Sequence, residues 1–151
     1  MRILTSVALI ASAPFIASCA TSIQPETAPS STVLPSSIAA DQLVGGWGLA
    51  AYHQEGARAR TEAAARRQCN NPYKITKGPT GGVMMYLADS KELSELKLKG
   101  GPGGKNYIGP DGPIGETDRE IISFNGKVMA MRWLDPEVAG RYGTMVYVRC
   151  T

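Results

Sequence analysis

Short apolar segments separated by turn residues run from Asp41 to the end of the chain, and this pattern favours β-strands. The spacing predicts a meander of about seven or eight strands, which closes into a small antiparallel barrel or sandwich. The expected fold class is therefore mainly β (α+β), with one helix. The strand segments cover residues 43–52, 73–76, 83–88, 95–99, 106–108, 119–125, 126–134 and 144–150.

One segment has a helical pattern instead, at residues 55–68, which are rich in Ala, Arg and Glu. Arg58, Glu62 and Arg66 recur at every fourth position, so they would lie along one helical face as attractive pairs. The positive charge in the last turn complements the helix dipole, and the residues Asn70-Asn71-Pro72 end the pattern. We expect one helix here.

The C-terminal hairpin has an Asn-Gly turn signal at Asn125-Gly126. A two-residue turn there would pair Phe124 with Lys127 and Ile122 with Met129. The face expected to point to the core then carries Ile122, Phe124, Met129, Met131 and Trp133.

The first residues predict a leader. Met1-Arg2 is followed by an uncharged apolar stretch, Ile3 to Ile16, which is too short to span a bilayer and is typical of a signal peptide. The residues that follow, Ile16-Ala17-Ser18-Cys19, resemble the bacterial lipobox. This resemblance implies a lipoprotein signal peptide over 1–18, cleavage before Cys19, and lipid such as palmitate on that cysteine. An ordinary secretory signal cut near Ala17 or Ala20 is the alternative.

By resemblance to enterobacterial sorting rules, the absence of Asp at Ala20 favours the outer membrane, with the protein facing the periplasm. In residues 19–40, the lipobox resemblance implies a lipidated Cys at the first position, and the Ser, Thr, Pro and Ala that dominate the rest predict a disordered linker. The folded domain is expected over 41–151.

The cysteine count predicts one disulfide in an exported protein. Lipid on Cys19 leaves Cys69 and Cys150, which predict a disulfide in an oxidising compartment. Such a bond would contribute about 4 kcal/mol by restricting the unfolded chain. Two buried free thiols are the alternative.

The charge pattern constrains the partners. The net charge of +3 is mild and no dense Lys/Arg run is present, so we expect no nucleic-acid partner. Within the helix, Arg58, Arg60, Arg66 and Arg67 form a basic face that could meet an anionic envelope component such as lipopolysaccharide phosphate or anionic lipid. The alternative is a solvated face without a ligand.

Catalytic signals are weak. The glycine-rich run Lys99–Asn106 lacks the Gly and the Ser or Thr that a phosphate-binding loop needs at its two ends, so a mobile loop is expected. His53 is the only histidine, and a Cys–His pair would need a thiol that the disulfide uses. We therefore expect no enzyme, metal or cofactor. A hydrolase dependent on His53 or Asp111 is the opposing hypothesis.

The opening strand contains Trp47, which we expect to close the core of the barrel. Its surroundings, Val44 to Leu49, resemble the first strand of bacterial periplasmic inhibitors of secreted metalloproteases. The sequence thus predicts a noncatalytic envelope lipoprotein with a binding or structural role. The resemblance implies an alternative, a periplasmic inhibitor of a protease or other hydrolase.

Overall fold

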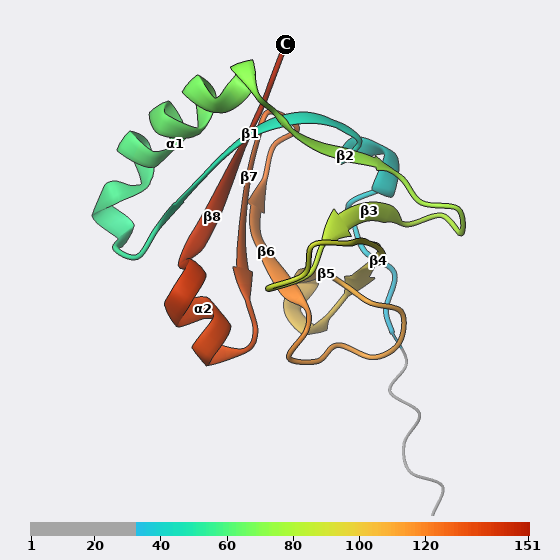
Figure 1. Ribbon diagram of the computed structural model, residues 1–151. Coiled ribbons are helices and arrows are strands. Elements are labelled where there is room, and N and C mark those ends of the chain that lie inside the picture. Colours follow the sequence, from blue (N-terminus) through green and yellow to red (C-terminus); the bar gives the residue numbers. More distant parts are fainter. Residues whose placement is uncertain (1–32) are drawn as a thin grey trace, which may run out of the picture. The chain divides into compact units, whose positions relative to one another are not determined.

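Eight antiparallel strands form a closed barrel in which each strand pairs with its sequence neighbours and β8 returns to β1 (Figure 1). The structure is a computed structural model and describes residues 33–151. This fold confirms the expected class. The strands are β1 (Gly45–Tyr52), β2 (Tyr73–Lys77), β3 (Val83–Tyr86), β4 (Leu93–Gly100), β5 (Asn106–Gly109), β6 (Arg119–Phe124), β7 (Val128–Trp133) and β8 (Thr144–Arg149).

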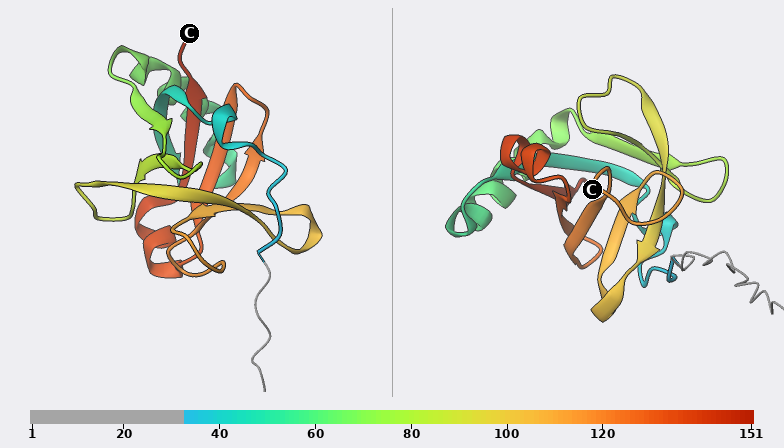
Figure 2. Two further views of the ribbon diagram at one scale, coloured as in Figure 1. Left: turned by 90° about the vertical axis from the view of Figure 1, so that its right-hand side faces the viewer. Right: turned by 90° about the horizontal axis from the view of Figure 1, so that it is seen from below.

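Helix α1 (Arg58–Arg67) lies on the outside of the barrel, against β1 and β8 (Figures 1 and 2). Single 3₁₀ turns extend it at both ends, at Glu55–Ala57 and Gln68–Asn70, so the helix predicted over 55–68 is confirmed. Its buried residues, Thr61 and Ala65, have small side chains that allow the helix to approach the sheet closely.

A second helix, α2 (Pro136–Tyr142), connects β7 to β8 and was not predicted. The Asp135 carboxylate caps it by accepting hydrogen bonds from the backbone N–H groups of Glu137 (2.8 Å) and Val138 (3.0 Å). Pro136 occupies the first turn, where its missing N–H has no cost. Within residues 33–151, no helix is long and apolar enough to cross a membrane.

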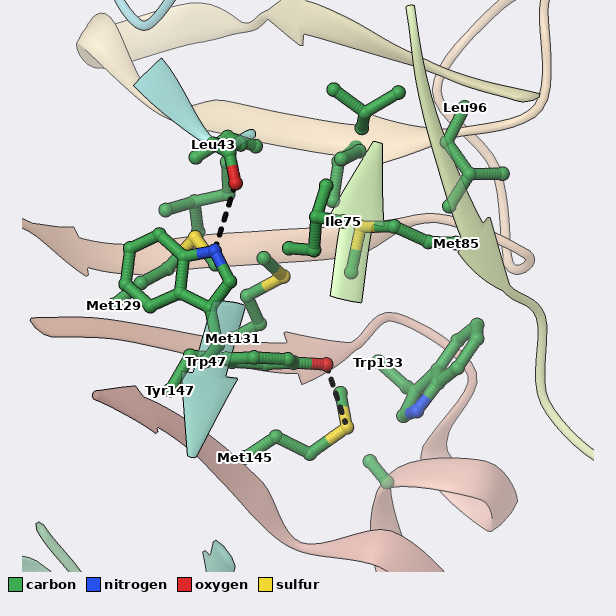
Figure 3. Close-up of a cluster of buried hydrophobic side chains, with 14 residues drawn as sticks. Leu43, Trp47, Ile75, Met85, Leu96, Met129, Met131, Trp133, Met145 and Tyr147 are labelled. Atoms are coloured by element: carbon green, nitrogen blue, oxygen red, sulfur yellow. Dashed lines mark hydrogen bonds between the residues drawn. The ribbon is translucent and has the colours of Figure 1, made fainter. Parts of the chain in front are cut away.

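Large apolar side chains fill the barrel (Figure 3). Trp47 is fully buried and donates a hydrogen bond from Nε1 to the Leu43 carbonyl at 2.8 Å. The expectation that Trp47 is a core residue is confirmed. Its neighbours in the interior include Ile75, Val83, Met85, Leu96, Ile108, Met129, Met131 and Tyr147.

The predicted register of the C-terminal hairpin is wrong. Phe124 pairs with Met129, not with Lys127, and Arg119 pairs with Trp133. The Asn125 side chain explains the difference, because its Oδ1 accepts hydrogen bonds from the backbone N–H groups of Lys127 (3.0 Å) and Val128 (2.7 Å). Asn125 therefore stands before the turn, not inside it.

A β-bulge on β6 changes which isoleucine faces the core. Ile121 is buried, whereas Ile122 is 46% exposed, so the predicted place of Ile122 on the core face is wrong. The inward positions of Met129, Met131 and Trp133 are confirmed. Phe124 packs against the core and is only partly buried.

The end of the predicted linker lies on the barrel. Within 19–40, residues 34–37 contact the β4–β5 hairpin, and Gly100 donates a backbone hydrogen bond to the Leu34 carbonyl at 2.7 Å. The Asn106 side chain accepts from the hydroxyl of Ser36 (2.7 Å) and the backbone N–H of Ser37 (2.9 Å). Serine side chains that suggested a linker thus serve as hydrogen-bond donors. The leader, Cys19 and the rest of the linker lie outside the described residues.

Cys69 and Cys150 are joined by a disulfide, with their Cα atoms 5.4 Å apart and 81 positions apart in sequence. Cys69 lies in the last turn of the helical segment, Gln68–Asn70, and Cys150 follows β8. The predicted pair is therefore at bonding distance.

Candidate functional site

A groove of about 590 Å³ runs between α1 and the second half of β1. This volume is in the range of small-ligand and peptide clefts. The strand and the turn after it line one wall with residues 50–54. The helix and its first turn line the other wall with Ala57, Arg60, Thr61, Ala64 and Arg67.

The strand wall of this groove is a free sheet edge. β1 pairs with β8 as far as Tyr52, but with β2 only as far as Trp47. Cys150 donates a backbone hydrogen bond to Gly46, and because antiparallel bonds alternate, the even-numbered residues of β1 bond to β8. The backbone N–H and C=O groups of Leu49 and Ala51 then point to the side that has no strand partner in the described part of the chain.

The residues at this edge are poorly covered. Ala51 is exposed and Leu49 is only half-buried, in contrast to Trp47 two residues earlier in the same strand. The absence of bulky side chains at positions 50 and 51 leaves the edge open to an approaching backbone. The edge therefore presents hydrogen-bonding groups and a small apolar surface.

The helix wall carries the positive charge of the groove. Arg60 and Arg67 are two helical turns apart and both line the groove. Among residues 33–151, neither guanidinium has a carboxylate within ion-pair distance. The groove lining contains no Asp or Glu. The arrangement favours an anionic group.

The four arginines predicted as one anionic-partner face are divided by the structure. Arg58 lies on the opposite flank of α1, where it pairs with Glu62 at 3.3 Å and donates to the Ser123 hydroxyl at 2.8 Å. Arg66 borders a separate surface hollow near Val128 and Thr151. The sequence pattern therefore identified the helix but not which of its arginines act together.

Tyr52 and His53 end the strand wall. The Tyr52 hydroxyl donates to the Glu55 carboxylate at 3.2 Å, and burial together with this carboxylate raises the pKa of Tyr52. His53 is exposed in the groove, and its side chain makes no hydrogen bond within the described residues. In that part of the chain, no acid or hydroxyl orients the imidazole. His53 therefore contributes to the groove as a polar wall residue.

The lysine of the glycine-rich run has a structural role. Lys99 is buried, and its Nζ contacts the Asp118 carboxylate at 2.7 Å and the Pro113 carbonyl at 3.1 Å. It therefore points into the domain and cannot reach a phosphate at the surface. Asp111 is exposed and accepts only from the neighbouring Gly112 N–H among the described hydrogen bonds.

A second buried cation, Arg119, was not identified from the sequence. Its guanidinium stacks over Trp133 at 4.2 Å and donates to the Tyr86 carbonyl. Tyr147 is also fully buried, and burial raises its pKa to about 12 although the nearby Arg119 opposes the shift. Both side chains are internal packing groups and are closed to solvent.

No metal-binding group of three or more His, Cys, Asp or Glu side chains occurs within residues 33–151. In comparisons with known proteins, no family model, curated protein or solved structure matches this chain. The site is therefore interpreted from its own geometry.

Proposed function

We propose that this chain is a noncatalytic envelope lipoprotein that is anchored by lipid on Cys19 and binds another envelope component through the groove between β1 and α1. The observation that carries the binding role is that one groove combines an open strand edge with Arg60 and Arg67, neither of which has an ion-pair partner among residues 33–151. The lipobox resemblance of residues 16–19 supports the anchor and a place at the outer membrane, facing the periplasm.

The position of the groove is compatible with anchoring. Residues 33–34, where the described chain begins, and α1 lie on opposite sides of the barrel (Figures 1 and 2). The described start of the chain therefore does not occupy the groove. A partner could reach Ala51 and Arg60 while the protein stays anchored.

Site-directed photocrosslinking in the anchored full-length protein tests the binding role. A crosslinking residue at Ala51 should give a discrete adduct, and one at the exposed Ile122 should not. Arg60→Glu and Arg67→Glu, each made alone, should weaken the adduct and together should remove it, whereas Arg66→Glu, the same charge change as either single variant but at a separate hollow, should keep it. Equal adducts from both positions, or an adduct indifferent to the charge reversal, would contradict the proposal.

The identity of the adduct separates two roles. A structural or transport protein of the envelope fits the binding module that we propose. A hydrolase that loses activity at one-to-one stoichiometry would instead support the inhibitor alternative implied by the Val44–Leu49 resemblance.

The anchor is tested by intact mass. The native protein should have the mass of a chain beginning at Cys19 with added acyl groups, and Cys19→Ala should release the protein from membranes. An unmodified thiol at Cys19 would refute the anchored part of the proposal.

A further inference from the structure

We infer that the occupant of the groove is an extended peptide segment that adds to β1 as a further strand and carries acidic side chains at alternate positions. The inference rests on the proposed function, since it takes the groove as the binding surface. It goes further by naming the chemical class of the partner and its mode of binding.

The strand edge supplies the main-chain contacts. The free stretch from Leu49 to His53 is about 13 Å long at the usual rise of a strand, which accommodates about five residues of a partner. The outward N–H and C=O groups of Leu49 and Ala51 repeat at the two-residue spacing that an added strand requires. A compact ligand would leave most of these backbone N–H and C=O groups without a hydrogen-bond partner.

The two sides of the added strand would meet different surfaces. α1 lies over the outer face of β1, so every second side chain of the partner would point toward Arg60 and Arg67. The remaining side chains would point toward the half-buried Leu49 and the exposed Ala51. An alternation of acidic and small apolar residues fits both surfaces.

The charge also selects against a second copy of this chain. Pairing of two β1 edges would bring the arginines of two α1 helices together without a carboxylate in either groove lining. Repulsion of like charges at a partly desolvated contact opposes that arrangement. The groove thus favours a negatively charged foreign segment over self-association.

The test uses the full-length protein in detergent and a short fluorescent peptide of alternating glutamate and valine. Binding measured by anisotropy should be saturable, and Arg60→Glu with Arg67→Glu should weaken it about tenfold or more. Arg66→Glu should change it by about twofold or less. Circular dichroism of each variant controls for folding.

Backbone methylation of the peptide tests strand addition without changing the protein. One peptide is methylated at the backbone nitrogens of its glutamates and the other at those of its valines. Successive N–H groups of a strand point to opposite edges, so each peptide lacks hydrogen-bond donors along one edge only. One should bind about tenfold more weakly than the unmodified peptide, and the other should bind almost as well, because only one edge faces β1.

Several results would overturn the inference. Equal binding of the two methylated peptides would exclude strand addition, and equal binding of a lysine–valine peptide would exclude charge selection. Inorganic phosphate that displaces the peptide at millimolar concentration or below would indicate a simple anion site.

Failure of the inference can be distinguished from failure of the proposed function. If crosslinking from Ala51 succeeds but the peptide fails to bind, the inference is wrong and the proposed function remains. If crosslinking from the groove also fails, both the inference and the proposed function are wrong.

Discussion

At the scale of single residues, the interior ion pair between Lys99 and Asp118 positions a long loop. Both side chains are at most 3% exposed, and their charged atoms are 2.7 Å apart. The other Asp118 oxygen accepts from the Gly115 N–H at 2.6 Å, and Lys99 also donates to the Pro113 carbonyl. The pair therefore holds residues 110–117 against the barrel.

Removal of one partner of this pair should be costly. Lys99→Met leaves the Asp118 carboxylate buried without a counter-charge, and we expect a loss of about 3–5 kcal/mol in the free energy of unfolding. The double variant Lys99→Met/Asp118→Leu should lose less, because it leaves no buried charge. Urea unfolding measures both. A double variant less stable than the single one would show that the loop contacts, and not the uncompensated charge, dominate.

Glu95 gives a prediction about pH. Burial opposes ionisation of its carboxylate, but hydrogen bonds from Gly82 and Thr80 and from Lys97 outweigh it and lower the pKa from 4.5 to about 2. Because the folded pKa lies below the unfolded one, the ionised group stabilises the protein fully above pH 4.5 and loses this effect as the pH falls toward 2.

The variant Glu95→Gln should therefore be less stable than the wild type at neutral pH by an amount that is constant down to about pH 4.5 and shrinks below it. Thermal unfolding of both proteins across this range checks the prediction. A difference that persists unchanged at pH 2 would show that the loss comes from geometry and not from the charge.

At the scale of elements, the docking of α1 on β1 depends on Gly48. A Cβ atom at this position would lie 1.9 Å from the Ala65 carbonyl oxygen, well inside any allowed contact. The Cys69 sulfur is also only 3.3 Å from that point, so the disulfide restricts any retreat of the helix.

Gly48→Ala should thus displace α1 and destabilise the domain by several kcal/mol. Gly140→Ala is the matched control, because a Cβ there meets nothing within 4 Å and alanine favours the helix α2. We expect the control to be neutral or more stable by about 0.5–1 kcal/mol. Chemical denaturation distinguishes the two, and a Gly48→Ala protein of native stability would contradict the close packing.

The elements also show where sequence reasoning succeeds and fails. The strands and α1 could be predicted from local residue spacing. Each strand buries one face, and α1 carries charges at helical spacing. The helix α2 was missed because it is short and contains Gly140, which lowers helix propensity. The bulge that exchanges Ile121 for Ile122 could not be inferred, since both side chains are equally apolar and only packing in the closed barrel selects one.

The candidate site was predictable only in part for a similar reason. The charge pattern of residues 55–68 indicated an anionic partner, but the helix orientation decides that Arg60 and Arg67 line the groove while Arg58 does not. The free edge of β1 is a property of barrel closure. The length of this free edge depends on where β2 stops pairing with β1, after Trp47, and no local sequence pattern at Leu49 or Ala51 predicts that point.

At the scale of the whole molecule, β2 is joined to both of its neighbours by only a few residue pairs. β1 pairs with β2 over Gly45–Trp47 only, and β2 pairs with β3 only at Thr76 and Lys77. Arg149 strengthens the end of the barrel, because its guanidinium donates to the carbonyl groups of Gly126 (2.8 Å) and Val44 (3.0 Å) and stacks on Trp47. These contacts join β8 and the β6–β7 turn to the start of β1.

The disulfide should supply a large share of the remaining stability. It closes a loop spanning 81 positions, for which the loss of unfolded-chain entropy corresponds to about 4 kcal/mol, against a total of about 5–15 kcal/mol for a typical domain. Reduction, Cys69→Ser and the double variant Cys69→Ser/Cys150→Ser should each lower the urea midpoint by a similar amount, because each removes the same constraint.

The native circular dichroism spectrum should survive these changes at low urea, since the entropic effect acts on the unfolded chain and leaves the contacts of α1 with β1 and β8 in place. Loss of the native spectrum on reduction would show instead that the disulfide maintains the pairing of β1 with β2. In that case the free edge at Leu49 and Ala51 would lengthen when the bond is reduced, and peptide binding to the groove would become sensitive to the redox state of the compartment.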